Sequence, residues 1–114
     1  MKIPAIRKLV TGWPGVTEDV KWGNDLVFSV GGRMFCAMDA SGKGGLGFKV
    51  EPERFLELTD RPGIVPAPYL ARAHWVSVAD AKAIPEAELR ALLRRSYELV
   101  RGKLSKKLQR ELAE

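Results

Sequence analysis

Apolar side chains recur at every second position in the first half of the chain, which is the pattern of a half-buried β-strand. One such run covers residues 26–30, and a second begins directly after Gly31-Gly32. Two glycines between alternating runs predict a two-residue hairpin turn. A turn of that length sets the register of the two strands and pairs Val30 with Arg33, Phe28 with Phe35 and Leu26 with Ala37.

This register predicts which side chains share a face, because side chains alternate along a strand. We take one face as the core side, and it holds Leu26, Phe28, Val30, Phe35 and Ala37. The other face holds Val27, Ser29, Met34, Cys36 and Met38, and a strand over residues 46–50 adds Lys49 to it. An uncovered, half-apolar sheet face is a candidate surface for a partner or a small ligand. The alternative is that the proline-rich segment Pro62–Tyr69 folds across this face.

The remaining periodic segments alternate between helix and strand. Helical patterns cover residues 4–10, 51–58 and 85–101, and Ser105 is positioned to cap a last helix. Proline stands near the start of the first three, where the helix tolerates it, and Gly102 is a natural C-cap. Residues 75–78 alternate and predict one more strand. Helices and antiparallel strands in one short chain predict an α+β fold with a single domain over residues 1–114.

Positive charge is concentrated in one part of the chain. The sequence has 19 Lys and Arg against 14 Asp and Glu, a net charge of +5. Residues 1–89 carry equal numbers of both signs, whereas residues 90–110 carry eight basic side chains and Glu98 alone. The excess charge is therefore a property of the last helical segments.

This charge makes nucleic-acid binding the leading functional hypothesis, because Lys and Arg that neutralise phosphates supply most of such affinity. Arg90, Arg94 and Arg101 lie within a narrow sector of the helix, with Tyr97 beside them. Arg33 and Lys43, near hairpin turns, are candidates for further phosphate contacts. The alternative is a solvated helix face whose basic residues favour the helix C-terminus through its dipole.

Composition excludes several classes of protein. Cys36 is the single cysteine and His74 the single histidine, so neither an intramolecular disulfide nor a Cys- or His-rich metal site is available. A metal site could instead draw on acidic side chains, namely Glu51, Glu53, Glu57, Asp39 and Asp60. However, Glu51 and Glu53 suit the first turn of a helix, and we expect no metal and no cofactor. No pair of base and nucleophile stands out, so we expect a non-enzymatic protein. The sequence has no apolar run of membrane-spanning length, so we expect no membrane partner. We also find no export signal, which favours a cytoplasmic location.

Three aromatic side chains and one lysine each have two alternative roles, one functional and one structural. Trp22, His74 and Trp75 are candidates for a platform on which a base stacks, or they pack structurally. Lys49 either binds an anion or lies along the sheet with its ammonium group in water. Together with Met34, Cys36 and Met38, the residues His74, Trp75 and Lys49 form our candidate partner or ligand face.

Short motifs in a fixed order give the chain a family resemblance. They are Trp13-Pro14-Gly15-Val16, Lys21-Trp22-Gly23, Gly32-Arg33-Met34-Phe35, Gly47-Phe48-Lys49-Val50, Pro62-Gly63-Ile64-Val65-Pro66-Ala67, His74-Trp75 and Ser96-Tyr97-Glu98-Leu99-Val100. The ordered set resembles the MmcQ/YjbR-like family of small bacterial proteins. The resemblance implies a CyaY/frataxin-like two-layer α+β sandwich, in which an antiparallel sheet carries terminal helices packed on one face. It also implies DNA binding, linked to a double-wing arrangement of the hairpins.

The sequence therefore predicts a DNA-binding protein that contacts mainly the phosphate backbone through Arg33, Lys43, Arg90, Arg94 and Arg101. The alternative is a protein-interaction or small-ligand module that uses the open sheet face. Neither the oligomeric state nor a choice between DNA and RNA follows from the residues.

Overall fold

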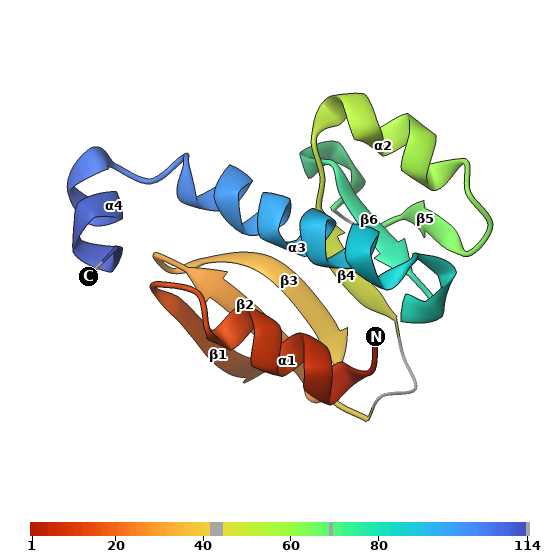
Figure 1. The fold of residues 1–114 in the computed structure, drawn as a ribbon, viewed down its shortest axis with the longest axis horizontal. Coiled ribbons are helices and arrows are strands. Elements are labelled where there is room, and N and C mark those ends of the chain that lie inside the picture. The colour runs from red at the N-terminus through yellow and green to blue at the C-terminus, as the bar shows by residue number, and fades with distance from the viewer. Residues whose placement is uncertain (42–44, 69, 114) are drawn as a thin grey trace.

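The computed structural model describes residues 1–41, 45–68 and 70–113 and has one helical layer against a six-stranded antiparallel sheet (Figure 1). The strands are ordered β1-β2-β3-β4-β6-β5. They comprise β1 (Val16–Lys21), β2 (Asp25–Val30), β3 (Arg33–Asp39), β4 (Leu46–Lys49), β5 (Ile64–Pro66) and β6 (Trp75–Val78). The helices are α1 (Ile3–Thr11), α2 (Pro52–Thr59), α3 (Glu86–Arg101) and α4 (Lys106–Leu112), with short 3-10 turns at Ala71–Ala73 and Ala81–Ala83. The α+β prediction is confirmed.

The longest helix, α3, packs on the sheet through the apolar side that its periodicity predicts. Of the residues predicted on this side, Leu89, Leu92, Leu93, Ser96 and Val100 are buried and Leu99 is only half-buried. Tyr97, predicted beside the arginine stripe, is buried as well. The helix packs mainly on β3, with further contacts to β4 and β2. Its observed bounds, Glu86–Arg101, match the prediction for residues 85–101 within one residue. A spacing of 3.6 residues per turn is sufficient to predict this face, because it depends only on local geometry.

The predicted register of the central hairpin is wrong beyond its first pairs. Val30 pairs with Arg33 as expected, but the register then shifts at Phe28/Ser29, so Phe28 pairs with Cys36 and Leu26 with Met38. Phe35 is the extra residue of this β-bulge. A one-residue slip moves every later side chain to the opposite face. Cys36 and Met38 therefore lie in the core, and Ala37 lies on the open face.

A buried serine holds the bulge against the helical layer. The Oγ of Ser96 in α3 donates to the carbonyl oxygen of Phe35 at 2.7 Å and accepts from the backbone N–H of Lys49 at 3.0 Å. Ser96 is fully buried, and these two bonds use backbone groups that the strand ladder leaves unpaired. The ring of Phe35 enters the core, where it packs edge-on against Tyr97, with 5.6 Å between ring centroids.

Two edge strands that the sequence analysis did not assign complete the sheet. β1 pairs with β2 along its whole length, and most of its side chains are exposed. β5 lies within the predicted loop of residues 60–69 and pairs with β6. Residues 64–66 of this loop therefore extend the sheet edge, and Pro68 after them borders the cleft on the open face. Within the ranges that the structure describes, no helix is long and apolar enough to cross a membrane.

Candidate functional site

The predicted arginine stripe of α3 is engaged within the molecule. The guanidinium carbon of Arg94 lies 4.9 Å from the ring centroid of Tyr97 and 5.2 Å from that of Trp13. Arg94 also lies 3.7 Å from a carboxylate oxygen of Glu98, and Arg90 lies 3.7 Å from one of Glu86. Arg90 and Arg94 remain about half exposed, so these contacts reduce the charge that they present to a partner without burying it.

The last arginine of the stripe joins two helices. The guanidinium of Arg101 donates to the backbone carbonyl of Gln109 at 2.9 Å, which ties the end of α3 to α4. A hollow of about 400 Å³ lies at this junction, and it is lined by Arg101, Lys106, Gln109, Arg110 and Ala113.

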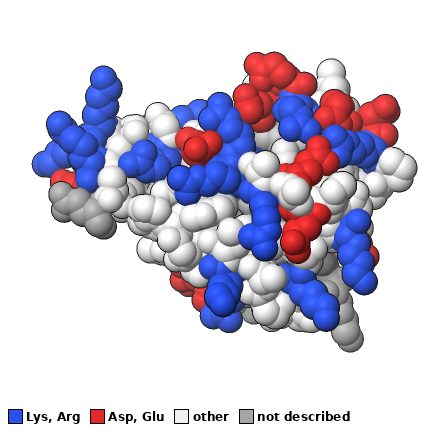
Figure 2. Space-filling view, viewed as in Figure 1, with Lys and Arg blue, Asp and Glu red and all other residues white. Residues whose placement is uncertain are grey.

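A second group of basic side chains gathers around α4 (Figure 2). We define the basic end as Arg33, Lys103, Lys106, Lys107 and Arg110, all of them exposed. None of the five forms an ion pair with a carboxylate in the part of the chain that the structure describes. Most acidic side chains visible in Figure 2 lie instead over α2 and the start of α3. The positive charge is therefore concentrated at one end of the molecule.

Tight packing positions this basic end. Gly31, in the turn between β2 and β3, has a φ of +59°, and a Cβ placed on it would lie 2.5 Å from a methyl group of Leu104. Leu108 of α4 lies against the same glycine. The hairpin turn that precedes Arg33 thus touches the helix that carries the lysines. Lys43, the other predicted hairpin contact, lies outside the described residues.

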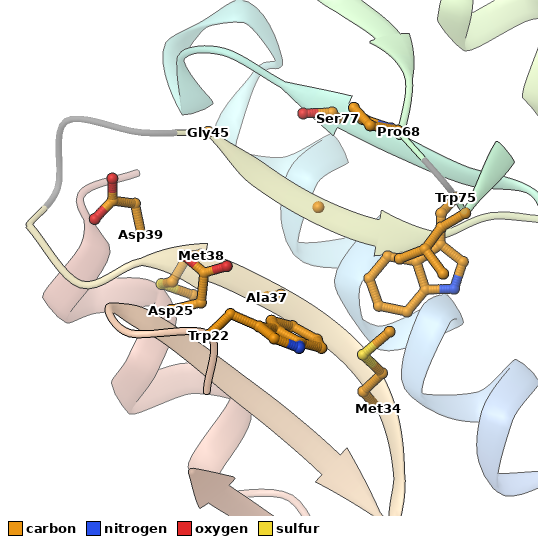
Figure 3. A pocket seen from close by; sticks show the side chains of 12 residues that line it. Trp22, Asp25, Met34, Ala37, Met38, Asp39, Gly45, Pro68, Trp75 and Ser77 are labelled. Atoms are coloured by element: carbon orange, nitrogen blue, oxygen red, sulfur yellow. The ribbon is translucent and has the colours of Figure 1, made fainter. Parts of the chain in front are cut away.

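The uncovered face of the sheet holds a cleft of about 710 Å³ (Figure 3). Figure 3 looks onto this face, with α1 and α3 behind the sheet. Ala37 of β3 and its pairing partner Gly47 of β4 form the floor of the cleft. Figure 3 shows Trp22, Met34 and Trp75 around Ala37. Its rim also includes Asp25, Met38, Asp39, Gly45, Pro68, Leu70 and Ser77. The open face is therefore hollowed and mainly apolar.

The two tryptophans of the cleft differ in how they are held. Trp75 belongs to β6 and is only 4% exposed, and a Cβ on Gly47 would lie 3.7 Å from its ring. Trp22 lies in the turn between β1 and β2 with a φ of 52°, and it is 68% exposed. A bulky residue with positive φ is uncommon, because its Cβ crowds the backbone. The turn thus holds a large aromatic side chain at the edge of the cleft.

The structure divides the predicted ligand face into three groups. Met34 and Trp75 line the cleft as predicted. Cys36 and Met38 were predicted on this face and instead belong to the core, although Met38, 2% exposed, also borders the cleft. Burial raises the pKa of the Cys36 thiol, which leaves it without the thiolate that nucleophilic chemistry needs.

Lys49 and His74, the third group, are not among the residues that line the cleft, although Lys49 pairs with Trp75 across the sheet and His74 precedes Trp75 in the chain. The ammonium of Lys49 donates to the backbone carbonyl of Ala73 at 2.7 Å. Burial, followed by the neighbouring ammonium of Lys103, lowers the pKa of Lys49. The ring of His74 packs edge-on against Phe55, with 5.6 Å between centroids. The three-residue aromatic platform proposed for Trp22, His74 and Trp75 therefore reduces to the two tryptophans.

Sequence reasoning missed the floor and the acidic end of the cleft. Ala37 was placed in the core because the bulge at Phe35 leaves no mark in the alternating pattern. Gly45 and Gly47 were read only as parts of a turn and a strand, and Asp25 and Asp39 were not assigned to any site. The one available signal was the spacing of the two glycines, which places both on the same face of a strand.

The fold defines the class of protein, and comparison with known proteins identifies the family. A bare sheet face opposite a helical layer defines a small α+β protein of two layers. The chain belongs to the YjbR family, whose model matches residues 11–99. This confirms the resemblance to the MmcQ/YjbR-like family.

The relatives extend this similarity over most of the chain. The uncharacterized protein YbdF of Escherichia coli O157:H7 is 32% identical over an alignment of 88 residues, and the match covers 75% of this chain and 72% of YbdF. The crystal structure of Deinococcus radiodurans protein DR2400, a DUF419 domain, superposes with a TM-score of 0.87 at 33% identity, covering 97% of this chain and 87% of that one. A Pseudomonas syringae protein of known structure shares the fold with a TM-score of 0.71 at 21% identity, covering 88% of this chain and 99% of its own.

Proposed function

We propose that this protein is a non-enzymatic DNA-binding module that contacts mainly the phosphate backbone. The observation that supports this proposal is the basic end, where five exposed cationic side chains lack ion pairs with described carboxylates. Such side chains are free to exchange bound counterions for phosphates. Arg90, Arg94 and Arg101, by contrast, would first have to leave their internal partners.

The proposal moves the main contacts from the α3 stripe to α4 and the hairpin turn. Arg33 begins β3 directly after the turn that packs on Leu104, so the turn and α4 present their charges on one end of the molecule. Contacts to phosphate carry no sequence information, and we therefore expect sequence-tolerant binding.

Titration of a fluorescein-labelled DNA duplex by anisotropy, at about 50 and about 200 mM salt, tests this function. We expect binding at low salt that weakens steeply as salt rises. In the variant K106A/K107A, the slope of log K against log salt should become shallower by about 2, since two phosphate contacts are lost. The matched control R72A/K82A removes the same charge from exposed positions outside the basic end, and it should keep the slope of the unmodified protein.

Three outcomes would contradict the proposal or its location. An absence of binding at low salt would contradict DNA binding itself, and binding insensitive to salt would contradict the phosphate mechanism. If the control R72A/K82A made the salt slope shallower by the same amount, net charge alone would account for the binding. Replacing the duplex with RNA of the same sequence in parallel distinguishes the two nucleic acids.

A second candidate function is binding of a small ligand at the open sheet face. The cleft supports this candidate, because its volume of about 710 Å³ lies within the range of about 300–1,000 Å³ that is typical of ligand pockets. Its exposed Trp22 and buried Trp75 offer apolar and aromatic contact area. Ligand-detected NMR with aromatic fragments tests this function, and an absence of any contact with the two indoles would contradict it.

We further propose that the fold is of the CyaY/frataxin type and that the protein acts in the bacterial cytoplasm. The antiparallel sheet with helices packed on one face supports the first statement. The bacterial origin of the relatives supports the bacterial part of the second. Superposition on a frataxin structure with the same strand order tests the fold. Fractionation of bacterial cells that express the protein tests the location.

A further inference from the structure

The cleft on the open sheet face is apolar in the middle and acidic at one end. Ala37 and Gly47 give it a flat floor, and Trp22 and Trp75 border that floor. At the acidic end of the cleft, Asp25 of β2 pairs directly with Asp39 of β3, so both side chains lie on the same face of adjacent strands. Like charges placed opposite each other across two strands destabilise a sheet. The fold thus keeps two carboxylates together beside an aromatic cleft.

Asp39 is held in its anionic form. One of its carboxylate oxygens accepts hydrogen bonds from the backbone N–H of Ser41 at 2.8 Å, from the Ser41 hydroxyl at 2.8 Å and from the Asn24 amide at 3.2 Å. The bonds from Ser41 lower the pKa of the Asp39 carboxyl. The negative charge at this end of the cleft is therefore maintained well below neutral pH.

Asp25 lacks such support. Its carboxylate forms no hydrogen bond or ion pair with any other residue in the ranges that the structure describes. It is partly buried at the rim of the cleft and lies opposite a second anion. A cation bound at this point would relieve the repulsion between the two carboxylates.

Trp22 adds a second feature that favours a cation. Its indole is 68% exposed at the edge of the cleft, on a backbone with a φ of 52°. The face of an indole attracts an organic cation through its quadrupole. The aromatic and acidic parts of the cleft thus both favour a positively charged ligand and disfavour phosphate.

We propose that this cleft binds a small organic cation with a planar apolar body, such as an aromatic amidine or amine. The body lies on Ala37 and Gly47 beside the two indoles, and the charged group meets Asp25 and Asp39. The inference deepens the second candidate function and rests on it. It is independent of DNA binding, because the basic end shares no residue with the cleft.

Three isosteric probes test the charge preference: benzamidine (cationic), benzamide (neutral) and benzoate (anionic). Each is titrated into the full-length, isotope-labelled protein while the indole N–H resonances are followed by NMR. We expect benzamidine to shift the resonances of Trp22 and Trp75 and to bind about fivefold more tightly than benzamide, with benzoate weakest. Trp13, which packs against Phe35 and Tyr97 on the helical side, serves as the internal control.

Two substitutions test the residues. Asp25→Asn keeps the side-chain shape, and it should lower the affinity for benzamidine about fivefold while the affinity for benzamide stays the same. Trp22→Ala should lower the affinity for benzamidine by a similar factor of about five. The control K106A/K107A should leave both affinities unchanged.

The outcomes separate the two levels of the proposal. If no probe shifts Trp22 or Trp75, the ligand-binding function of the cleft is wrong. If benzamide or benzoate binds as well as benzamidine, the cleft binds ligands but its preference for cations is wrong. If Asp25→Asn leaves benzamidine binding unchanged, the assignment of the carboxylate is wrong.

Discussion

At the scale of single residues, Cys36 illustrates how one backbone irregularity changes the chemistry of a side chain. The alternating pattern placed its thiol on the open face, where it would be accessible. The bulge at Phe35 turns it into the core, where it is completely buried. Its neighbours there are apolar, and the desolvation of the charged form raises its pKa.

We therefore expect Cys36 to be inert in the folded protein. Ellman's reagent should label no measurable fraction of the native protein, and it should label one thiol per chain in guanidinium chloride. The absorbance of the released thiolate gives both values. Rapid labelling without denaturant would show that the thiol is accessible and would contradict the observed register.

Ser96 is the residue on which the bulge depends. Ser96→Ala removes both its bond to the carbonyl of Phe35 and its bond from the N–H of Lys49. Since buried backbone groups would lose their partners, we expect the free energy of unfolding to fall by about 2 kcal/mol. Urea denaturation measures this loss.

Ser29→Ala is the matched control, because Ser29 is also a buried serine and its hydroxyl has no hydrogen bond among the described residues. We expect it to change the free energy of unfolding by about 0.5 kcal/mol or less. Equal effects at the two positions would mean that the bridge by Ser96 contributes nothing specific.

At the scale of elements, the helices were predictable and the sheet was only partly so. The buried faces of α1 and α3 follow from spacing within each helix, because every contact in a helical turn is local. Strand pairing joins distant residues, and one extra residue such as Phe35 reverses a face without changing composition. The edge strands β1 and β5 were missed for a similar reason, since they form by pairing with a neighbour and their side chains are mostly exposed.

The contact between the hairpin turn and α4 gives a test at this scale. Gly31 and Gly32 both have positive φ, but a Cβ on Gly31 would meet Leu104 and Leu108, whereas one on Gly32 would meet nothing within 4 Å. Gly32→Ala should cost about 1 kcal/mol for its backbone conformation. Gly31→Ala should cost about 1–3 kcal/mol more, because the added Cβ also pushes Leu104 and Leu108 away from the turn.

Urea denaturation of the two variants measures this difference. Equal stability of the two variants would mean that α4 does not pack on the turn. Because the packing also positions the basic end, Gly31→Ala should weaken DNA binding more than Gly32→Ala does.

At the scale of the whole molecule, charge is divided between a basic end and an acidic side. Glu88 at the start of α3 accepts hydrogen bonds from Arg61 at 2.7 and 2.9 Å and from Arg54 at 3.2 Å. Arg61 and Arg54 also bind Glu57 of α2, so the network joins α2 to α3. These bonds lower the pKa values of Glu88 and Glu57 below the ordinary 4.5.

Stability should therefore fall at acid pH. A carboxyl whose pKa is lower in the folded state stabilises the fold above its unfolded pKa, and this contribution is lost as the pH falls through the folded pKa. We expect the melting temperature to be nearly constant above about pH 5 and to fall below it. Thermal melts followed by circular dichroism over this range measure the effect.

Glu88→Gln isolates the network. At neutral pH it should lower the free energy of unfolding by about 1 kcal/mol, and the difference from the unmodified protein should shrink in acid. Glu86→Gln in the same helical turn is the control, because its contact with Arg90 is longer, at 3.7 Å, and more exposed. A difference between Glu88→Gln and the unmodified protein that stays constant with pH would contradict the role of the network.

The sequence by itself determined the α+β class, the helical faces, the hairpin turn at Gly31-Gly32, the family and the segment that carries the excess charge. All of these depend on local spacing or on composition, which the chain order contains directly. The tertiary structure decided which cations lack ion pairs, because pairs such as Arg95 with Glu51 join residues far apart in the chain. It also decided the floor of the cleft and the pairing of Asp25 with Asp39, because a bulge and a sheet register result from packing between strands.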